Sequence, residues 1–579
     1  MPAGINYRTA TLVAAISLIL SACVQPTPRG TEPAATAEIK ASAPDIGEIS
    51  TSVVHDEAQY KRYLEAISHD YFEGRGAGAV GEKRFVPWLV QQFKDIGLSP
   101  GNGDSYLQNV PMLELTGSIK APLSFTRTAS GGQSQTTTLV PGEDFILSSH
   151  IAAPEVSLSG SEMIFMGYGV NQPSEQWNDY AGVDVKGKTV VVLINDPGFH
   201  EGNAGLFNGK AMTYAGRWTY KFEEAARQGA AACIIIHDIA GASYGWDVLK
   251  NGWGRPEFEL PKQAGAISPL TAQGWITEAS AKALLSNAGF DLETLRTAAN
   301  QRGFKPVALN MKASAVISNK IRSTQSQNVA ALIRGTKNPE EVVIYTAHWD
   351  HLGRNFQLPV DGIYNGAIDN GTGVAALLEM ARVLQKSPPE RSVLMLAVTL
   401  EESGLLGSRF YAENPLFPLN QTVANLNMDA LPLIGPSKEV VVIGFGNSRL
   451  EDLLALFVKA QNRKLVPEPT PENGFYFRSD HFNFAKVGVP ALYIKSGPDH
   501  LEKGVEYGTA WMAAYNKDRY HKPSDEFDPS ADYRGVMQDM ELMLMMGAVL
   551  ANGRAFPGWY ESSEFHAIRA KNPPKASVQ

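Results

Sequence analysis

Residues 342–350, with the sequence VVIYTAHWD, contain the pattern that decides the fold. Their opening run of apolar residues predicts a strand buried on both faces, and polar side chains follow at its end. Similar strands are predicted at 392–398, 423–428, 440–443 and 491–494, and helices at 373–385, 405–412, 449–461, 480–486 and 533–551. Because buried strands alternate with helices, the sequence predicts an α/β fold with a mostly parallel central sheet flanked by helices.

Charged side chains gather at the ends of these strands and in the turns between them. Parallel strands bring their carboxyl ends to one edge of a sheet, where acidic groups repel one another unless cations neutralise them. Each residue also has an ordinary interpretation, such as a helix N-cap for Asp369. Taken together, two histidines and three carboxylates are a set of ligands that suits zinc. The histidines and acidic residues of these segments are His348, Asp350, His351, Asp369, Glu401, Glu402, Asp429, His521 and Asp525.

These segments resemble the di-zinc exopeptidase family that includes bacterial leucyl aminopeptidases and glutamate carboxypeptidase. The resemblance extends over about residues 60–553, and all five metal positions match in order. It implies two Zn²⁺ ions per chain, with Asp369 bridging both ions. By the same match, His348 and Asp429 hold one ion and Glu402 and His521 hold the other.

The resemblance also places a general base at Glu401 and a residue that orients His348 at Asp350. Two zinc ions lower the pKa of a shared water, and a carboxylate outside the metal ligands must then take the proton. Tyr520, next to His521, is either a donor to the developing oxyanion or a packed aromatic residue.

Residues 150–310 resemble the protease-associated domain, a β-rich module that is inserted into some exopeptidases. This divides the peptidase domain into residues 56–149 and 311–579. The stretch 57–115 is expected to be largely helical, and its G-x-G-x-x-G match at 76–81 is interpreted as a turn, because no strand precedes it.

The leading functional hypothesis is a metallo-aminopeptidase that hydrolyses N-terminal residues from peptide substrates. A carboxypeptidase of the same fold is the near alternative, because Arg354, Arg409 and Arg478 are close in sequence to the motifs and could bind a free carboxylate. A serine esterase using Ser243 of the G-x-S-x-G match at 241–245 and a non-catalytic binding protein are further alternatives. The esterase motif needs a strand before it and a long helix after it, and the residues after 245 do not predict a long helix.

The first 23 residues resemble a bacterial lipoprotein signal peptide that ends at Cys23. A lipid on Cys23 would anchor the chain to a membrane of the cell envelope, facing the periplasm and more often in the outer membrane, or the chain is exported. Residues 24–55 are expected to be an extended tether. Lys plus Arg is 51 and Asp plus Glu is 60, and the absence of clustered cations argues against a nucleic-acid partner.

Overall fold

The strand predicted at 342–345 forms the centre of the main sheet. It belongs to β13 (Asn338–His348), which pairs in parallel with β14 (Arg391–Val398) and with β15 (Thr422–Asn427). The parallel order continues to β18 (Ala491–Ser496), while the neighbours beyond β18 and β14 are antiparallel. Those neighbours are β16 (Glu439–Val442), which pairs with β17 (Lys464–Pro467), and β12 (Val307–Ile333). The predicted α/β fold with a mostly parallel sheet is therefore confirmed.

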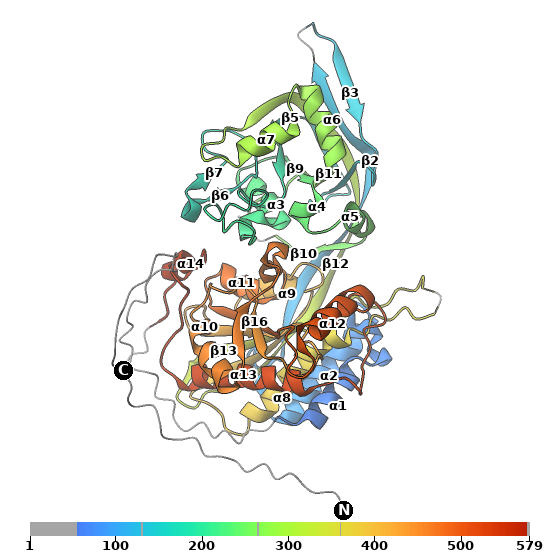
Figure 1. The fold of residues 1–579 in the computed structure, drawn as a ribbon. Helices are drawn as coiled ribbons and strands as arrows, with labels where there is room; N and C mark the ends of the chain where they lie inside the picture. The colour runs from blue at the N-terminus through green and yellow to red at the C-terminus, as the bar shows by residue number, and fades with distance from the viewer. Residues whose placement is uncertain (1–54, 129–130, 263–265, 359, 576–579) are drawn as a thin grey trace, which may run out of the picture. The chain divides into compact units, whose positions relative to one another are not determined.

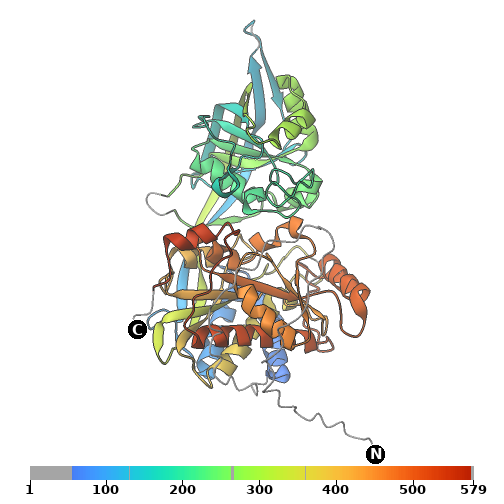
Figure 2. The same cartoon turned by 60° about the vertical axis from the view of Figure 1, so that its left-hand side comes forward.

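Helices cover both faces of this sheet (Figures 1 and 2). Successive residues of a strand point to opposite faces, so Tyr345 packs against one layer of helices and Ile344 against the other. The first layer contains α1 (Glu57–Ile67), α2 (Val80–Ile96), α8 (Thr372–Leu384), α10 (Leu450–Ala460) and α13 (Arg534–Asn552). The second layer contains α9 (Leu406–Glu413) and α11 (His481–Lys486).

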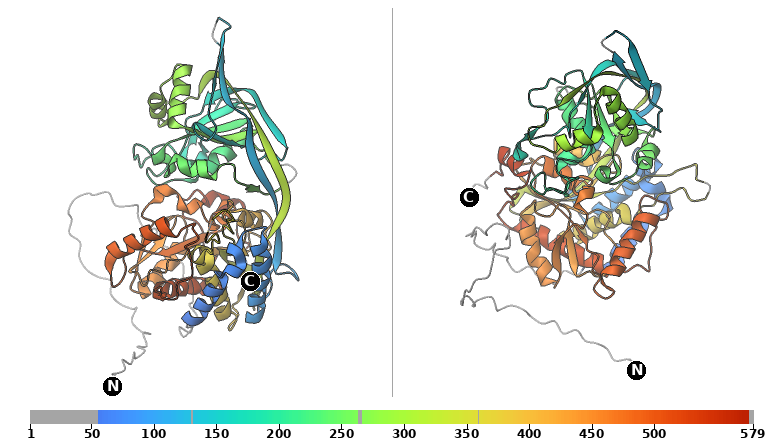
Figure 3. Two further views of the ribbon diagram at one scale, coloured as in Figure 1. Left: turned by 90° about the vertical axis from the view of Figure 1, so that its right-hand side faces the viewer. Right: turned by 45° about the horizontal axis from the view of Figure 1, so that its top comes forward.

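A second α/β region lies between α2 and β13 in the sequence. Its strands β5 (Glu155–Phe165), β8 (Thr189–Leu193), β9 (Ala232–His237) and β11 (Ala272–Thr277) pair in parallel, and β4 (Phe145–Ser148) adds an antiparallel edge. Figure 3 shows the helices on its two faces. They are α6 (Glu278–Ala288) and α7 (Leu292–Ala299) on one face and α3 (Trp218–Arg227) on the other. We call residues 145–299 the module.

Two long strands connect the module with the main sheet. β2 (Leu107–Thr128) and β12 pair along most of their length, and β12 pairs with β5 at one end and with β14 at the other. The expectation of helix up to residue 115 is therefore wrong beyond Ile96, where α2 ends. Residues 107–115 belong to β2, and their alternating burial suits a strand. The domain limits at 149/150 and 310/311, and the name of the inserted domain, stay predictions.

Further elements complete the chain. They are β1 (Ser99–Pro100), β3 (Ser134–Thr138), β6 (Asn171–Gln172), β7 (Trp177–Asn178), β10 (Glu257–Glu259), α4 (Ile239–Ala242), α5 (Trp246–Gly252), α12 (Gly504–Asp518) and α14 (His566–Lys571). The G-x-G-x-x-G match at 76–81 forms a turn that leads into α2, as predicted. Ser243 caps the end of the short helix α4, so the strand, turn and long helix of a serine-hydrolase motif are not formed around it.

The computed structural model describes residues 55–128, 131–262, 266–358 and 360–575. The predicted leader with Cys23, and the tether at 24–55 apart from His55, lie outside these residues. No helix in the described part of the chain combines the length and the apolar character that a membrane crossing requires.

Candidate metal centre

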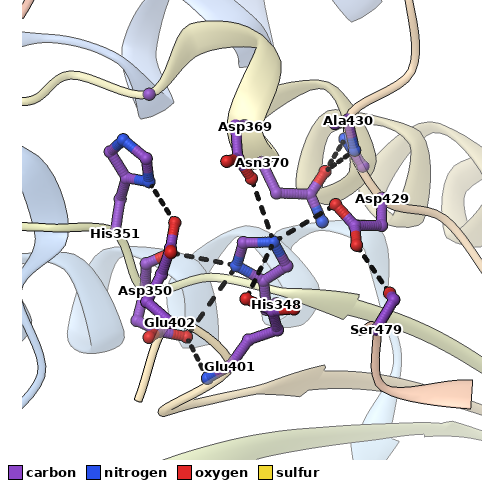
Figure 4. Close-up of polar contacts among 12 residues, drawn as sticks. His348, Asp350, His351, Asp369, Asn370, Glu401, Glu402, Asp429, Ala430 and Ser479 are labelled. Atoms are coloured by element: carbon purple, nitrogen blue, oxygen red, sulfur yellow. Dashed lines mark hydrogen bonds and ion pairs between the residues drawn. The ribbon is translucent and has the colours of Figure 1, made fainter. Parts of the chain in front are cut away.

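The carboxyl ends of the central parallel strands bring the predicted site residues together, and Figure 4 shows all of them except Tyr520 and His521. His348 ends β13, Glu401 and Glu402 follow β14, and Asp429 follows β15. Asp369 comes from the turn before α8, and His521 from the turn after α12. This is the edge at which a parallel sheet of this kind places its functional groups.

Asp369 stands between two groups of metal-ligating atoms. The Nε2 atom of His348 lies 3.2 Å from Oδ1 of Asp369 and 3.4 Å from Oδ1 of Asp429. The Nε2 atom of His521 lies 3.2 Å from Oδ2 of Asp369 and 3.1 Å from Oε2 of Glu402. Each carboxylate oxygen of Asp369 therefore faces a different histidine, and each histidine also faces one further carboxylate.

The chemistry of these side chains fits divalent cations. His348, Asp369 and Glu402, and likewise His348, Glu401 and Asp429, each offer ligand atoms that lie within 4.8 Å of one another. Among the described residues, no Lys or Arg forms an ion pair with any carboxylate of these two groups. Buried carboxylates without such partners repel one another, and a bound cation would remove that repulsion.

The close spacing of these charged groups shifts the pKa values of Glu401, His348 and His521. Burial raises the pKa of Glu401 well above its usual value, and Asp429 and Glu402 add to the effect, against the charge of His348. Burial tends to lower the pKa of His348, yet Glu401, Asp369 and Asp429 raise it well above its usual value. For His521 the same competition raises the pKa to about 10, with Glu402 as the leading acidic partner.

Asp350 lies behind His348. Its Oδ1 atom is 3.9 Å from Nδ1 of His348, while its backbone carbonyl is closer, at 3.1 Å from the same nitrogen. The carboxylate also accepts a hydrogen bond from the backbone N–H of Glu401 at 3.2 Å. Burial raises the pKa of Asp350 to about 7. Asp350 thus contacts both the first histidine and the segment that carries Glu401.

Tyr520 lies beside the second histidine. Its ring stacks on the ring of His521 at a centroid distance of 3.9 Å and an angle of 22°. The side chain of His521 is 36 % exposed, whereas the side chains of His348 and Asp369 are at most 5 % exposed. This rim of the site is therefore its more open side.

Sequence reasoning gave no role to His351, which lies inside the site. Its Nδ1 atom is 2.6 Å from Oε1 of Glu402, and its buried Nε2 atom has no partner among the described residues. The sequence feature that could have indicated a role is the position of His351, three residues after His348. Because His351 lies in the loop after the strand, this spacing does not show where its side chain points.

Three further residues that hold the site in place were not predicted from the sequence. Ser479 donates a hydrogen bond to Oδ2 of Asp429 at 2.5 Å. Asp525 accepts hydrogen bonds from the backbone N–H groups of Ile368 and Asp369, at 3.0 and 3.1 Å. The buried Arg75 donates to backbone carbonyls, including that of Trp349 at 2.9 Å, and so places a positive charge behind the carboxylates.

Comparisons with known proteins find similarity to peptidases. Residues 328–545 match the model of Peptidase family M28. Aminopeptidase YwaD of Bacillus subtilis is 34 % identical over 136 residues, which are 23 % of this chain and 27 % of that protein. The "Probable lipoprotein aminopeptidase LpqL" of Mycobacterium tuberculosis is 27 % identical over 227 residues, which are 36 % of this chain and 42 % of that protein.

The chain thus spans less than half the length of these two relatives. Among solved structures, an aminopeptidase from Aneurinibacillus sp. strain AM-1 has a TM-score of 0.46 at 18 % identity, with 87 % of this chain and 95 % of that chain covered. Residues 328–545 contain every strand end and turn that contributes a predicted ligand. The part of the chain that carries the site is therefore similar to peptidase family M28, in agreement with the resemblance of its motifs.

Proposed function

We propose that the protein is a zinc-dependent aminopeptidase that removes N-terminal residues from peptides. The observation that carries this proposal is the position of Asp369, whose two oxygens face His348 and His521 at 3.2 Å each. The family match supports a peptidase, and the names of YwaD and LpqL support an aminopeptidase.

The residues present fit two zinc ions that share Asp369. His348 and Asp429 would hold one ion, and Glu402 and His521 would hold the other. Zinc bound here would supply an acidified water and a polarised scissile carbonyl. Zinc accepts histidine nitrogen and carboxylate oxygen, which are the atoms that converge at this edge of the sheet.

Glu401 is the proposed general base. Its carboxylate faces His348 at 4.0 Å and forms no hydrogen bond with another side chain of the described residues. It is therefore free to take a proton from the attacking water and to pass that proton to the leaving amine. Asp350 keeps the ring of His348 and the backbone of Glu401 in place.

Tyr520 is the proposed donor to the oxyanion. Its ring stacks on the ring of His521, which keeps this side chain beside the proposed metal ligands, where its hydroxyl would donate to the oxyanion. Replacing Tyr520 by Phe is expected to lower kcat and to leave the zinc content unchanged, whereas a residue that only packs would show no loss of kcat.

We further propose that a lipid on Cys23 anchors the enzyme in the cell envelope. The leader that ends at Cys23 supports this location, and LpqL is itself named a probable lipoprotein aminopeptidase. Labelling with a radioactive fatty acid is expected to mark the full chain and not its Cys23→Ser variant.

The decisive experiment for the function compares substrates with a free and a blocked amino group. The purified zinc-loaded chain is expected to hydrolyse amino-acid arylamides, to lose activity in a chelator and to regain it with zinc. N-acetylated peptides should not be cleaved. Cleavage of N-acetylated peptides at the C-terminus would instead establish the carboxypeptidase, and full activity in the chelator would contradict metal catalysis.

A further inference from the structure

Arg217 of the module lies against a loop next to the metal centre. It comes just before α3, and its Cδ atom is 3.3 Å from the point that a Cβ atom on Gly474 would occupy. Neighbouring contacts hold this segment in place: the N–H of Met212 donates to the carbonyl of Pro471 at 3.2 Å, and the ring of Tyr214 lies 4.7 Å from that of Phe482. The position of Arg217 is thus fixed by packing.

Arg478 belongs to the same loop and is close to the metal centre. The next residue, Ser479, donates to the proposed ligand Asp429. The guanidinium of Arg478 lies 5.3 Å from the ring of Phe475, and its side chain is exposed. Burial raises the pKa of Tyr520 well above its usual value, and the charge of Arg478 opposes that rise. Arg478 is therefore within electrostatic range of the residue beside His521.

The two arginines lack acidic partners. Neither guanidinium forms an ion pair or a side-chain hydrogen bond within the part of the chain that the structure describes, and Nε of Arg217 is buried without a partner. Burial, and then the charge of Arg478, lowers the pKa of Arg217 to about 10, so the Arg217 side chain remains charged at neutral pH. Arg217 also stands at the positive end of the α3 dipole.

Two other cations of the main region pair with carboxylates of the module. Arg409 pairs with Glu413 and Glu259, and Lys486 pairs with Glu223. Two neighbouring guanidinium groups repel each other, and this repulsion costs free energy when no carboxylate is near. An anion that binds both groups would offset that cost. A carboxylate matches the planar fork of a guanidinium and accepts two hydrogen bonds from it.

We propose that Arg217 and Arg478 bind a carboxylate of the peptide substrate, on the leaving-group side of the scissile bond. This rests on the proposed function and narrows it to short peptides, whose C-terminal carboxylate lies close to that bond, or to peptides with an acidic residue there. The module then contributes a residue that determines specificity. The bond to be cleaved remains the one after the N-terminal residue.

The test measures binding to the zinc-loaded full chain with the Glu401→Gln substitution, which prevents turnover. Calorimetry gives the Kd of L-alanyl-L-alanine and of its C-terminal amide. A second pair, the α-amides of L-alanyl-L-glutamate and L-alanyl-L-glutamine, tests a side-chain carboxylate. We expect the charged member of at least one pair to bind roughly tenfold more tightly, as charge-assisted hydrogen bonds predict.

Substitutions connect this preference with the two arginines. Arg217→Gln and Arg478→Gln should each bring the Kd ratio of that pair close to one, while Arg217→Lys should keep part of it. Arg255→Gln, an exposed arginine of the module, is the matched control and should keep the full ratio. Equal Kd values within both pairs, or a ratio that survives in both Gln variants, would overturn the proposal.

Failure of the proposed function would be visible separately. The chain with Glu401 intact would then hydrolyse none of the four dipeptide compounds, whatever the Kd ratios in the Glu401→Gln protein. The pair that shows the preference identifies the source of the carboxylate, since only the first pair differs at the C-terminus.

Discussion

Two buried clusters of charge, one at the edge of the main sheet and one in the module, are built in opposite ways. In the module, Lys221 donates to the backbone carbonyls of Tyr168 and Asn195 at 2.7 Å each. Asp196 accepts from both the N–H and the hydroxyl of Thr213, and Asp179 accepts from the N–H of Val170 and the indole of Trp177. This cluster contains its own cation and its own donors.

The carboxylates at the edge of the main sheet form no ion pair with a Lys or Arg among the described residues. Asp369, Glu402 and Asp429 share two histidines, and Glu401 accepts no side-chain hydrogen bond from the described residues. Arg75, the buried cation behind them, uses its donors on backbone carbonyls. Burial costs both clusters free energy, but only the module recovers it from within the chain. Buried carboxylates that form no ion pair with Lys or Arg therefore indicate a metal site better than a buried cluster that already contains a lysine.

The largest expected effect comes from removing the charge of Glu401 and nothing else. Glu401→Gln keeps the shape of the side chain but cannot take a proton, so kcat should fall by about 10²–10⁴-fold. Steady-state kinetics on an amino-acid arylamide measures this loss, and elemental analysis should find the zinc content unchanged.

The matched control is Glu561→Gln, which removes an exposed carboxylate near the C-terminus. It should keep the activity of the unsubstituted chain. A Glu401→Gln protein with full zinc and full kcat would refute the assignment of the base.

The corresponding change in the module should affect stability and leave the metal centre intact. Lys221→Met removes the buried ammonium and leaves two carbonyls without a donor and two aspartates without a nearby cation. The free energy of unfolding should fall by about 3–5 kcal/mol, as urea titration at pH 7 would measure.

Lys305→Met, an exposed lysine six residues after the end of the module, is the control and should change the unfolding free energy by less than about 0.5 kcal/mol. If Lys221→Met lowered the zinc content instead of the stability, the two clusters would not be independent.

The sequence allowed the sheet and the predicted ligands to be located, because both depend on local patterns. The runs at 342–345 and 392–398 are too apolar for an exposed strand, and the polar residues that follow them must lie at a strand end. These patterns alone were enough to place His348, Glu402 and Asp429 at one edge of the sheet. The length of β2 could not be predicted in this way, since only its pairing with β12 keeps 107–128 extended.

Contacts made by loops could not be predicted from the sequence either, because they join residues that are far apart in the chain. Arg75 precedes the glycine-rich turn at 76–81, and nothing local shows that its guanidinium reaches the carbonyls of Trp349 and Gly366. Arg217 and Gly474 are far apart in the sequence, so their contact depends on how the module meets the main sheet. Such contacts are determined by tertiary packing alone.

A smaller effect, on zinc affinity, is expected from replacing His351, which contacts the proposed ligand Glu402. His351→Phe removes the nitrogen that contacts Glu402, so zinc affinity should fall by about 10–100-fold, while His351→Asn should keep part of it. Competition with a chromophoric chelator measures the affinity. His566→Phe, at an exposed position, should bind zinc like the unsubstituted chain. Equal affinity in His351→Phe and the unsubstituted chain would show that His351 only fills space.

The smallest expected effect is a change in the pH dependence of stability caused by His481, a buried residue to which neither cluster provides a hydrogen bond. Burial lowers its pKa to about 3, and both ring nitrogens lack partners among the described residues. Because the folded pKa lies below the unfolded value of about 6.5, the neutral ring stabilises the fold above pH 6.5, and this stability is lost as the pH falls.

His481→Phe removes that proton uptake. Compared with the unsubstituted chain, the variant should therefore gain about 1.4 kcal/mol of relative stability for each pH unit below about 6. Urea unfolding of both proteins in a chelator, between pH 6 and 4.5, separates this effect from acid release of metal. Parallel pH profiles would mean that His481 does not titrate with unfolding. A steeper dependence in the unsubstituted chain would show that acid sensitivity also arises outside the carboxylates of the metal centre.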